Sequence, residues 1–109
     1  MDLGVYVYTV IYKFVVKENL EKAFQEAWRN GTKLIYKKLG SLGSRLQFSE
    51  KGEWLAYAVW PSKEQFEKPW DLSESENDLI SKIRECCINA EVLYKLDVVD
   101  DLIKSNISD

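Results

Sequence analysis

Apolar side chains fill both faces of the first extended segment of this chain. The run YVYTVIYKFVV, from Tyr6 to Val16, is rich in β-branched and aromatic residues, which suit a pleated, buried surface, and it predicts a first strand. Alternation places Val10 on one side and Ile11 on the other, each among mostly apolar neighbours. Both faces must be covered, and helices from so short a chain can cover only one of them.

Apolar residues at spacings of three and four follow this strand and predict a helix to about Lys38. Asn19 is expected to cap its first turn, because the side-chain oxygen can accept a hydrogen bond from an orphan amide. Gly40 is expected to end the helix. The stripe that should face the sheet consists of Leu20, Ala23, Phe24, Ala27, Trp28, Gly31, Leu34 and Ile35.

The middle of the chain predicts a β-hairpin, with strands over 41–48 and 53–60 joined by a turn at Lys51 and Gly52. Neither face of its second strand is polar. One face carries Trp54, Ala56, Ala58 and Trp60, and the other carries Leu55, Tyr57 and Val59.

Two helical segments and a last strand complete the pattern. Ser62 is expected to cap a short helix that Pro69 interrupts. A second helix should then span about 75–90, with a buried stripe of Leu79, Ile80, Ile83, Cys86, Cys87 and Ala90. The run EVLYKLDVV predicts a fourth strand over 92–99.

The order of these elements predicts an α+β fold of the ferredoxin-like βαββαβ type, an antiparallel sheet with helices on one face. At 109 residues the chain has room for one domain, expected over 1–109 with a frayed tail over about 104–109. The apolar face left bare is larger than a soluble monomer tolerates. A homodimer that closes two sheets into a dimeric α/β barrel is therefore expected.

Composition restricts the chemistry. The chain has no histidine, which excludes Ser-His-Asp and Cys-His catalysis and His-ligated zinc or haem. Cys86 and Cys87 are adjacent, a spacing that rarely permits a disulfide, so they are interpreted as reduced core thiols. No metal site is expected.

Charge and hydropathy indicate which partners to expect. The net charge of −3 argues against a nucleic-acid partner, because such binding needs clustered basic residues. No apolar run approaches the ~20 residues of a membrane span, and the start MDLGVYVY lacks the order of a signal peptide. A cytoplasmic protein without membrane contact is expected.

Four segments, spread over almost the whole chain, carry a resemblance to a known family. They read YTVIYKFVVKENLEKAFQEAW, GSLGSRLQ, WLAYAVWPSKEQFEKPW and LYKLDVVDDL. The chain resembles the antibiotic biosynthesis monooxygenase family of dimeric α/β barrels, which includes oxygenases of aromatic polyketides, quinol oxidases and haem-degrading enzymes. The resemblance implies the fold more strongly than the chemistry.

The haem-degrading branch of that family offers a more specific comparison. The segment AVWPSKEQF is similar to a tryptophan-bearing strand end of that branch, which implies a place in the site for Trp60. The branch also uses a strand asparagine, where this chain has Ile11, and a helical histidine, which this chain lacks. Haem degradation is therefore disfavoured.

The family's cofactor-independent oxygenases react electron-rich phenols with oxygen in a pocket between sheet and helices. The protein then supplies an apolar cavity, an aromatic wall and a few polar groups, and no cofactor is required. Small side chains beside a large aromatic residue would leave space for such a pocket. The residues predicted to act catalytically are Trp60 and Thr9, and those predicted to bind substrate are Trp28, Ile11, Ala56, Ala58 and Phe24.

Purely structural roles stay open for several of these residues. The two alanines can simply let a helix approach closely, and the two tryptophans can belong to the core. Tyr12 and Tyr57 are expected to point to the dimer side and to pack there.

Two functions follow as alternatives. One is a monooxygenase that oxidises a small phenolic, anthrone-like or quinol-like substrate with molecular oxygen. The other is a non-catalytic dimer that binds a small hydrophobic or aromatic ligand. They differ in whether a polar group contacts the substrate hydroxyl. An RNA-binding sheet of the same topology would need stacking aromatic residues with basic neighbours, which the acidic balance disfavours.

Overall fold

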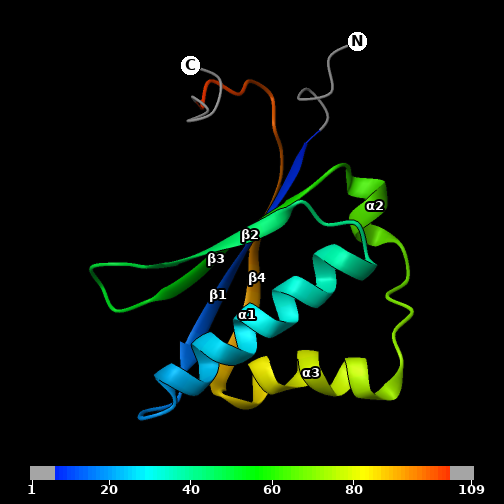
Figure 1. Ribbon diagram of the computed structural model, residues 1–109. Helices are drawn as coiled ribbons and strands as arrows, with labels where there is room; N and C mark the ends of the chain where they lie inside the picture. Colours follow the sequence, from blue (N-terminus) through cyan, green and yellow to red (C-terminus); the bar gives the residue numbers. More distant parts are fainter. Residues whose placement is uncertain (1–6, 104–109) are drawn as a thin grey trace, which may run out of the picture.

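A four-stranded antiparallel sheet organises the computed structural model, which describes residues 7–103 (Figure 1). The elements in chain order are β1 (Tyr8–Val16), α1 (Glu21–Lys38), β2 (Gly43–Phe48), β3 (Trp54–Trp60), α2 (Lys63–Glu67), α3 (Glu74–Glu85) and β4 (Cys87–Asp97). The strands lie side by side as β2-β3-β1-β4. This is the α+β, ferredoxin-like βαββαβ arrangement that the sequence predicts, with the short α2 added.

The pairing of β1 with β3 decides which side chains face the helices. Val10 lies opposite Ala58, and Tyr12 lies opposite Ala56. Both pairs point to the helices, because they cluster with Ile35 and Phe24 of α1. Figure 1 shows α1 and α3 together on that side of the sheet. Val10 and Phe24 are fully buried there, and burial of a side chain of this size stabilises the fold by roughly 1.5–3 kcal/mol.

The sequence predicted a capping residue for α1 and for α2, and the structure confirms one of the two predictions. Ser62 caps α2 as predicted, because its Oγ accepts a hydrogen bond from the Gln65 amide at 3.0 Å. The prediction of an Asn19 cap on α1 is wrong. Asn19 has a φ of +71°, a left-handed conformation that asparagine tolerates, and Leu20 takes the capping position without a side-chain bond.

The boundary between α3 and β4 also differs from the prediction, which continued the helix to about residue 90. The helix ends at Glu85, and Cys87 and Ala90 belong to β4, paired with Val16 and Phe14. The reason is that β1 is long enough to offer a backbone ladder as far as Cys87, which a continued helix would leave unpaired. Cys87 is nevertheless buried, as expected of a core thiol, and burial raises the pKa of its thiol.

The second face of the sheet carries none of the described helices, since α1, α2 and α3 all lie on the other side (Figure 1). Ile11 pairs with Tyr57 and Tyr94 across this face, and Thr9 pairs with Leu96. Tyr94 is 61% exposed and Leu96 is 43% exposed. The structure thus contains the bare apolar surface that the sequence indicates.

Two predictions concern residues outside the part of the chain that the structure describes. Tyr6, at the predicted start of the first strand, and the tail over about 104–109 lie outside the described residues. In the described part of the chain, no helix has the length and apolar character needed to cross a membrane.

The crossing of α1 and α3 generates a prediction about stability. A Cβ atom on Gly31 would lie 2.7 Å from Cδ1 of Ile83. We expect Gly31→Val to lower the free energy of unfolding by about 1–3 kcal/mol, because a branched side chain overpacks the crossing. Urea denaturation measures the change. Asn30→Val, at the exposed neighbouring position, is the control and should cost under about 0.5 kcal/mol. Equal losses in the two variants would contradict a close approach at Gly31.

Candidate functional site

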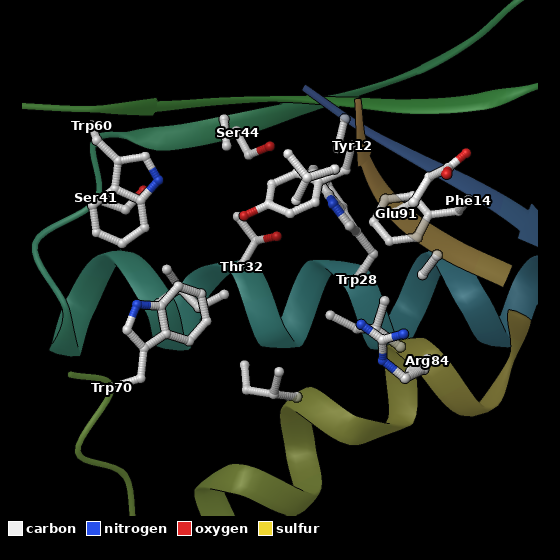
Figure 2. A pocket seen from close by; sticks show the side chains of 17 residues that line it. Tyr12, Phe14, Trp28, Thr32, Ser41, Ser44, Trp60, Trp70, Arg84 and Glu91 are labelled. Carbon is white, nitrogen blue, oxygen red and sulfur yellow. The ribbon is translucent and has the colours of Figure 1, made fainter. Parts of the chain in front are cut away.

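A cavity of about 320 Å³ lies between the helix-facing side of the sheet and helices α1 and α3 (Figure 2). Its walls are mainly apolar and aromatic, with a few hydroxyl groups and two charged residues. A volume of this size holds a small organic molecule. The aromatic side chains of the lining are Tyr12, Phe14, Trp28, Trp60 and Trp70.

Small residues on β3 make room for this cavity. Ala56 and Ala58 line it, and Trp60 at the end of the same strand face forms one wall. Trp28, which α1 contributes, forms another wall (Figure 2). Four of the predicted site residues therefore meet at one cavity. Trp60 is only 2% exposed, so it is a core residue as well as a cavity wall.

The other three predicted site residues do not line the cavity. Thr9 pairs with Val59 and Ile11 pairs with Tyr57, so both belong to the face that carries no helix. Thr9 was predicted to offer a polar contact inside the cavity. Its side chain lies on the opposite side of β1, because successive strand residues alternate between faces. Phe24 is fully buried against Phe14 and supports the cavity from behind.

Tyr12 is the polar aromatic residue that the sequence prediction misplaced. It was expected on the dimer side together with Tyr57, but its pairing with Ala56 turns it toward the helices. Figure 2 shows its ring entering the cavity with the hydroxyl directed toward Thr32. Burial raises the pKa of Tyr12, because desolvation disfavours the phenolate. At neutral pH the side chain is a hydrogen-bond donor.

Two serines of the cavity wall differ in how they are bonded. Ser41 Oγ accepts a hydrogen bond from the Gly43 amide at 2.9 Å and donates one to the Val59 carbonyl at 3.4 Å. Ser44 Oγ is buried and has no partner within the described residues. Leaving a buried hydroxyl unsatisfied costs about 1–3 kcal/mol. A ligand oxygen or a water molecule in the cavity would remove this cost.

One cation and one carboxylate border the cavity. Arg84 reaches toward it from the last turn of α3 (Figure 2). Glu91 borders it from β4, but it pairs with Lys13 on the helix-free face, and Figure 2 shows its carboxylate directed away from the cavity. Both are exposed, and neither takes part in an ion pair within residues 7–103. A guanidinium group remains charged at all ordinary pH values and offers five donors to an anion.

Some of these residues carried a usable signal in the sequence. Tyr12 shares its strand parity with Phe14, and Arg84 follows Ile80 by one helical turn. Trp70 carried none, because it lies in an irregular connection between helices. In the described ranges, no three histidine, cysteine or acidic side chains gather in a way that could hold a metal ion.

Comparisons with known proteins bear on the fold. No family model matches the chain, and no curated protein matches it by sequence. Solved structures do match. SnoaB, a cofactor-independent oxygenase from Streptomyces nogalater, superimposes with a TM-score of 0.72 at 13% identity, over 91% of this chain and 99% of that one. The chain has the fold of the antibiotic biosynthesis monooxygenases.

Two further solved structures share this fold. A candidate antibiotic biosynthesis monooxygenase from Bordetella bronchiseptica gives a TM-score of 0.72 at 15% identity, covering 86% of this chain and 98% of that one. A protein from Mycobacterium tuberculosis gives 0.68 at 15% identity, covering 89% and 99%. Identities this low establish the fold alone and leave the chemistry to the residues of the cavity.

The buried phenol of Tyr12 generates a prediction about alkaline pH. An unfolded chain loses the tyrosine proton near pH 10, whereas the folded chain holds it to higher pH. The folded state thus binds more protons in this window, and its stability falls as pH rises above about 10. We expect Tyr12→Phe to reduce this loss, measured as the free energy of unfolding between about pH 9 and pH 11.

The matched control is Tyr36→Phe, which removes a hydroxyl from an exposed position on α1. The burial of Tyr12 would be contradicted if wild type and Tyr12→Phe lost stability with the same slope.

Proposed function

We propose that this protein is a cofactor-independent monooxygenase that oxidises a small phenolic, anthrone-like or quinol-like molecule with molecular oxygen. The observation that carries the proposal is an aromatic cavity with a buried hydroxyl, Ser44 Oγ, that has no partner among the residues the structure describes. Such a cavity suits a flat, electron-rich molecule with an oxygen substituent. The shared fold with SnoaB, itself named a cofactor-independent oxygenase, supports the same reaction class.

Three polar side chains of the cavity have a place in this reaction. The substrate would lose its proton to water, because Glu91, the acidic residue of the described lining, has its side chain on the helix-free face. Arg84 would stabilise the resulting anion, since an unpaired cation beside an apolar cavity favours negative charge. Tyr12, held neutral by burial, and Ser44 would donate hydrogen bonds to the substrate oxygen.

The oxidation then balances without an added reductant. For a ring methylene, the carbanion left by deprotonation passes one electron to oxygen, and the radical and superoxide combine to form a carbon–oxygen bond. Protonation gives a hydroperoxide. Loss of the second carbon-bound hydrogen as a proton and cleavage of the oxygen–oxygen bond give a carbonyl and one water molecule. One CH₂ group and one O₂ thus yield one C=O group and one H₂O.

Oxygen uptake with anthrone and naphthols tests this proposal. We expect turnover by the wild type, and Ser44→Ala should lower kcat/KM about tenfold, because one hydrogen bond to a developing anion contributes roughly 1.5–3 kcal/mol. Trp60→Ala should abolish binding by opening the wall. Ser81→Ala, on the exposed part of α3, is the control. Binding of every phenol without oxygen uptake would overturn the oxygenase proposal.

A second candidate function is a non-catalytic protein that binds a small aromatic ligand. The position of Glu91 favours it, because this side chain points to the helix-free face and the described lining of the cavity offers no other carboxylate as a base. Saturable quenching of tryptophan fluorescence without oxygen consumption would establish this function instead.

We also propose that the protein is a homodimer that buries the helix-free face of the sheet. This face presents Ile11, Tyr57, Tyr94 and Leu96 to solvent or to a partner. A twofold pairing matches one apolar face with its own copy and requires no other protein. Two sheets so packed would form the barrel that the sequence predicts.

Sedimentation velocity at micromolar concentration tests the dimer. We expect two copies per particle for the wild type, and Tyr57→Glu should weaken the dimer by at least about a hundredfold, because an unpaired charge would be buried. Tyr36→Glu, at an exposed position on α1, should leave the dimer intact. A monomeric wild type would refute a covered sheet face.

A further inference from the structure

Helix α3 directs a positive charge toward the cavity. Ile80, Ile83 and Arg84 line it from one face of this helix, at spacings of three and four residues. Figure 2 shows the Arg84 guanidinium directed into the space between α3 and the sheet. Glu91 also borders the cavity, but it pairs with Lys13 on the helix-free face. The described lining therefore gives the cavity one positive charge and no negative charge.

This positive charge has no counter-ion in the described chain. Neither of the two ion pairs found within residues 7–103 includes Arg84. A guanidinium group stays charged at all ordinary pH values, and its planar fork matches the two oxygens of a carboxylate. An apolar cavity wall lowers the local dielectric constant and so strengthens the attraction between opposite charges. This corner of the cavity thus favours a ligand with an anionic group.

The neutral polar groups of the cavity lie in a different place. Figure 2 shows the hydroxyl groups of Tyr12, Thr32 and Ser44 near the middle of the cavity. The Arg84 guanidinium lies toward the end away from Trp60 (Figure 2). Ser44 Oγ is buried and has no hydrogen-bond partner among the described residues. A ligand that uses both regions needs a neutral oxygen group on its apolar body and an anionic group at one end.

We propose that the cavity binds a phenolic acid, with the phenol hydroxyl at Tyr12 and Ser44 and a carboxylate side chain paired with Arg84. This inference rests on the proposed function, since it narrows the phenolic substrate to one that carries a permanent negative charge. The carboxylate cancels part of the charge of Arg84. Stabilisation of the reacting oxygen then falls mainly to the hydroxyl groups of Tyr12 and Ser44.

Calorimetric titration at pH 7 with 3-(4-hydroxyphenyl)propanoate and with the corresponding amide tests the ion pair. The two compounds share their shape and their phenol, and only the acid carries a charge. We expect the wild type to bind the acid about fivefold more tightly, a modest factor because Arg84 is exposed. Arg84→Gln should remove this preference by weakening the acid alone. Arg84→Lys, which keeps the charge and loses the fork, should remove part of it.

Lys82→Gln is the matched control, because Lys82 is the other basic residue in the last turn of α3, is exposed and does not line the cavity. It should change both affinities less than about twofold. The proposal is overturned if Lys82→Gln weakens the acid as much as Arg84→Gln does, or if Arg84→Gln weakens acid and amide equally. It is also overturned if the wild type does not prefer the acid. Circular dichroism and thermal melting confirm that each variant is folded.

A third compound, 3-phenylpropanoate, tests the other end of the ligand, because it lacks the phenol hydroxyl. Ser44→Ala should weaken binding of the hydroxylated acid about fivefold, since the buried Ser44 hydroxyl loses its bond to the phenol. The same variant should change the affinity for 3-phenylpropanoate less than about twofold. Equal losses for the two acids would contradict the proposed orientation of the ligand.

Oxygen uptake separates this inference from the oxygenase proposal. A preference for the acid that depends on Arg84, in a protein that consumes no oxygen with any bound phenol, would support phenolic-acid binding and reject the oxygenase. Turnover of naphthols by a protein that binds acid and amide equally would support the oxygenase and reject phenolic-acid binding.

Discussion

The alternation of side chains along the paired strands β1 and β3 is the constraint on which the rest of this structure depends. Because both strands are apolar on both faces, one face takes the helices and the other is left for a second covering surface. The pairing of Val10 with Ala58 and of Tyr12 with Ala56 then decides where the cavity lies. A shift of one residue would send the alanines and the adjoining tryptophan to the open face.

The cavity results from an imbalance of side-chain size within this register. Two alanines on β3 stand between large aromatic residues, and α1 and α3 bridge the space without filling it. The α1–α3 crossing at Gly31 brings the helices close together, and Phe24 fills the sheet side behind the cavity. Within residues 7–103 the Ser44 hydroxyl has no partner, and a buried hydroxyl without a hydrogen bond opposes stability.

Much of the fold was predictable because it depends on periodicity, and the failures have physical causes. Alternation over β3 identified Ala56, Ala58 and Trp60 as one face, and the structure brings them together with Trp28. The face of β1 could not be assigned in the same way, since both of its sides are apolar, so Thr9 was placed with the cavity and Tyr12 away from it. The predicted boundary between α3 and β4 was wrong, because the pairing of β4 with β1 overrode the helical spacing of apolar residues.

The cavity and the helix-free face meet in a single strand. Tyr12 enters the cavity, and its neighbour Ile11 lies on the helix-free face, so adjacent residues of β1 border the proposed ligand site and the proposed dimer contact. Thr9 on the same strand is 2% exposed, and its hydroxyl is buried with no partner in the described chain. A second copy covering this face would hold β1 from behind, and the position of the phenol in the cavity would then depend on both packing faces of one backbone.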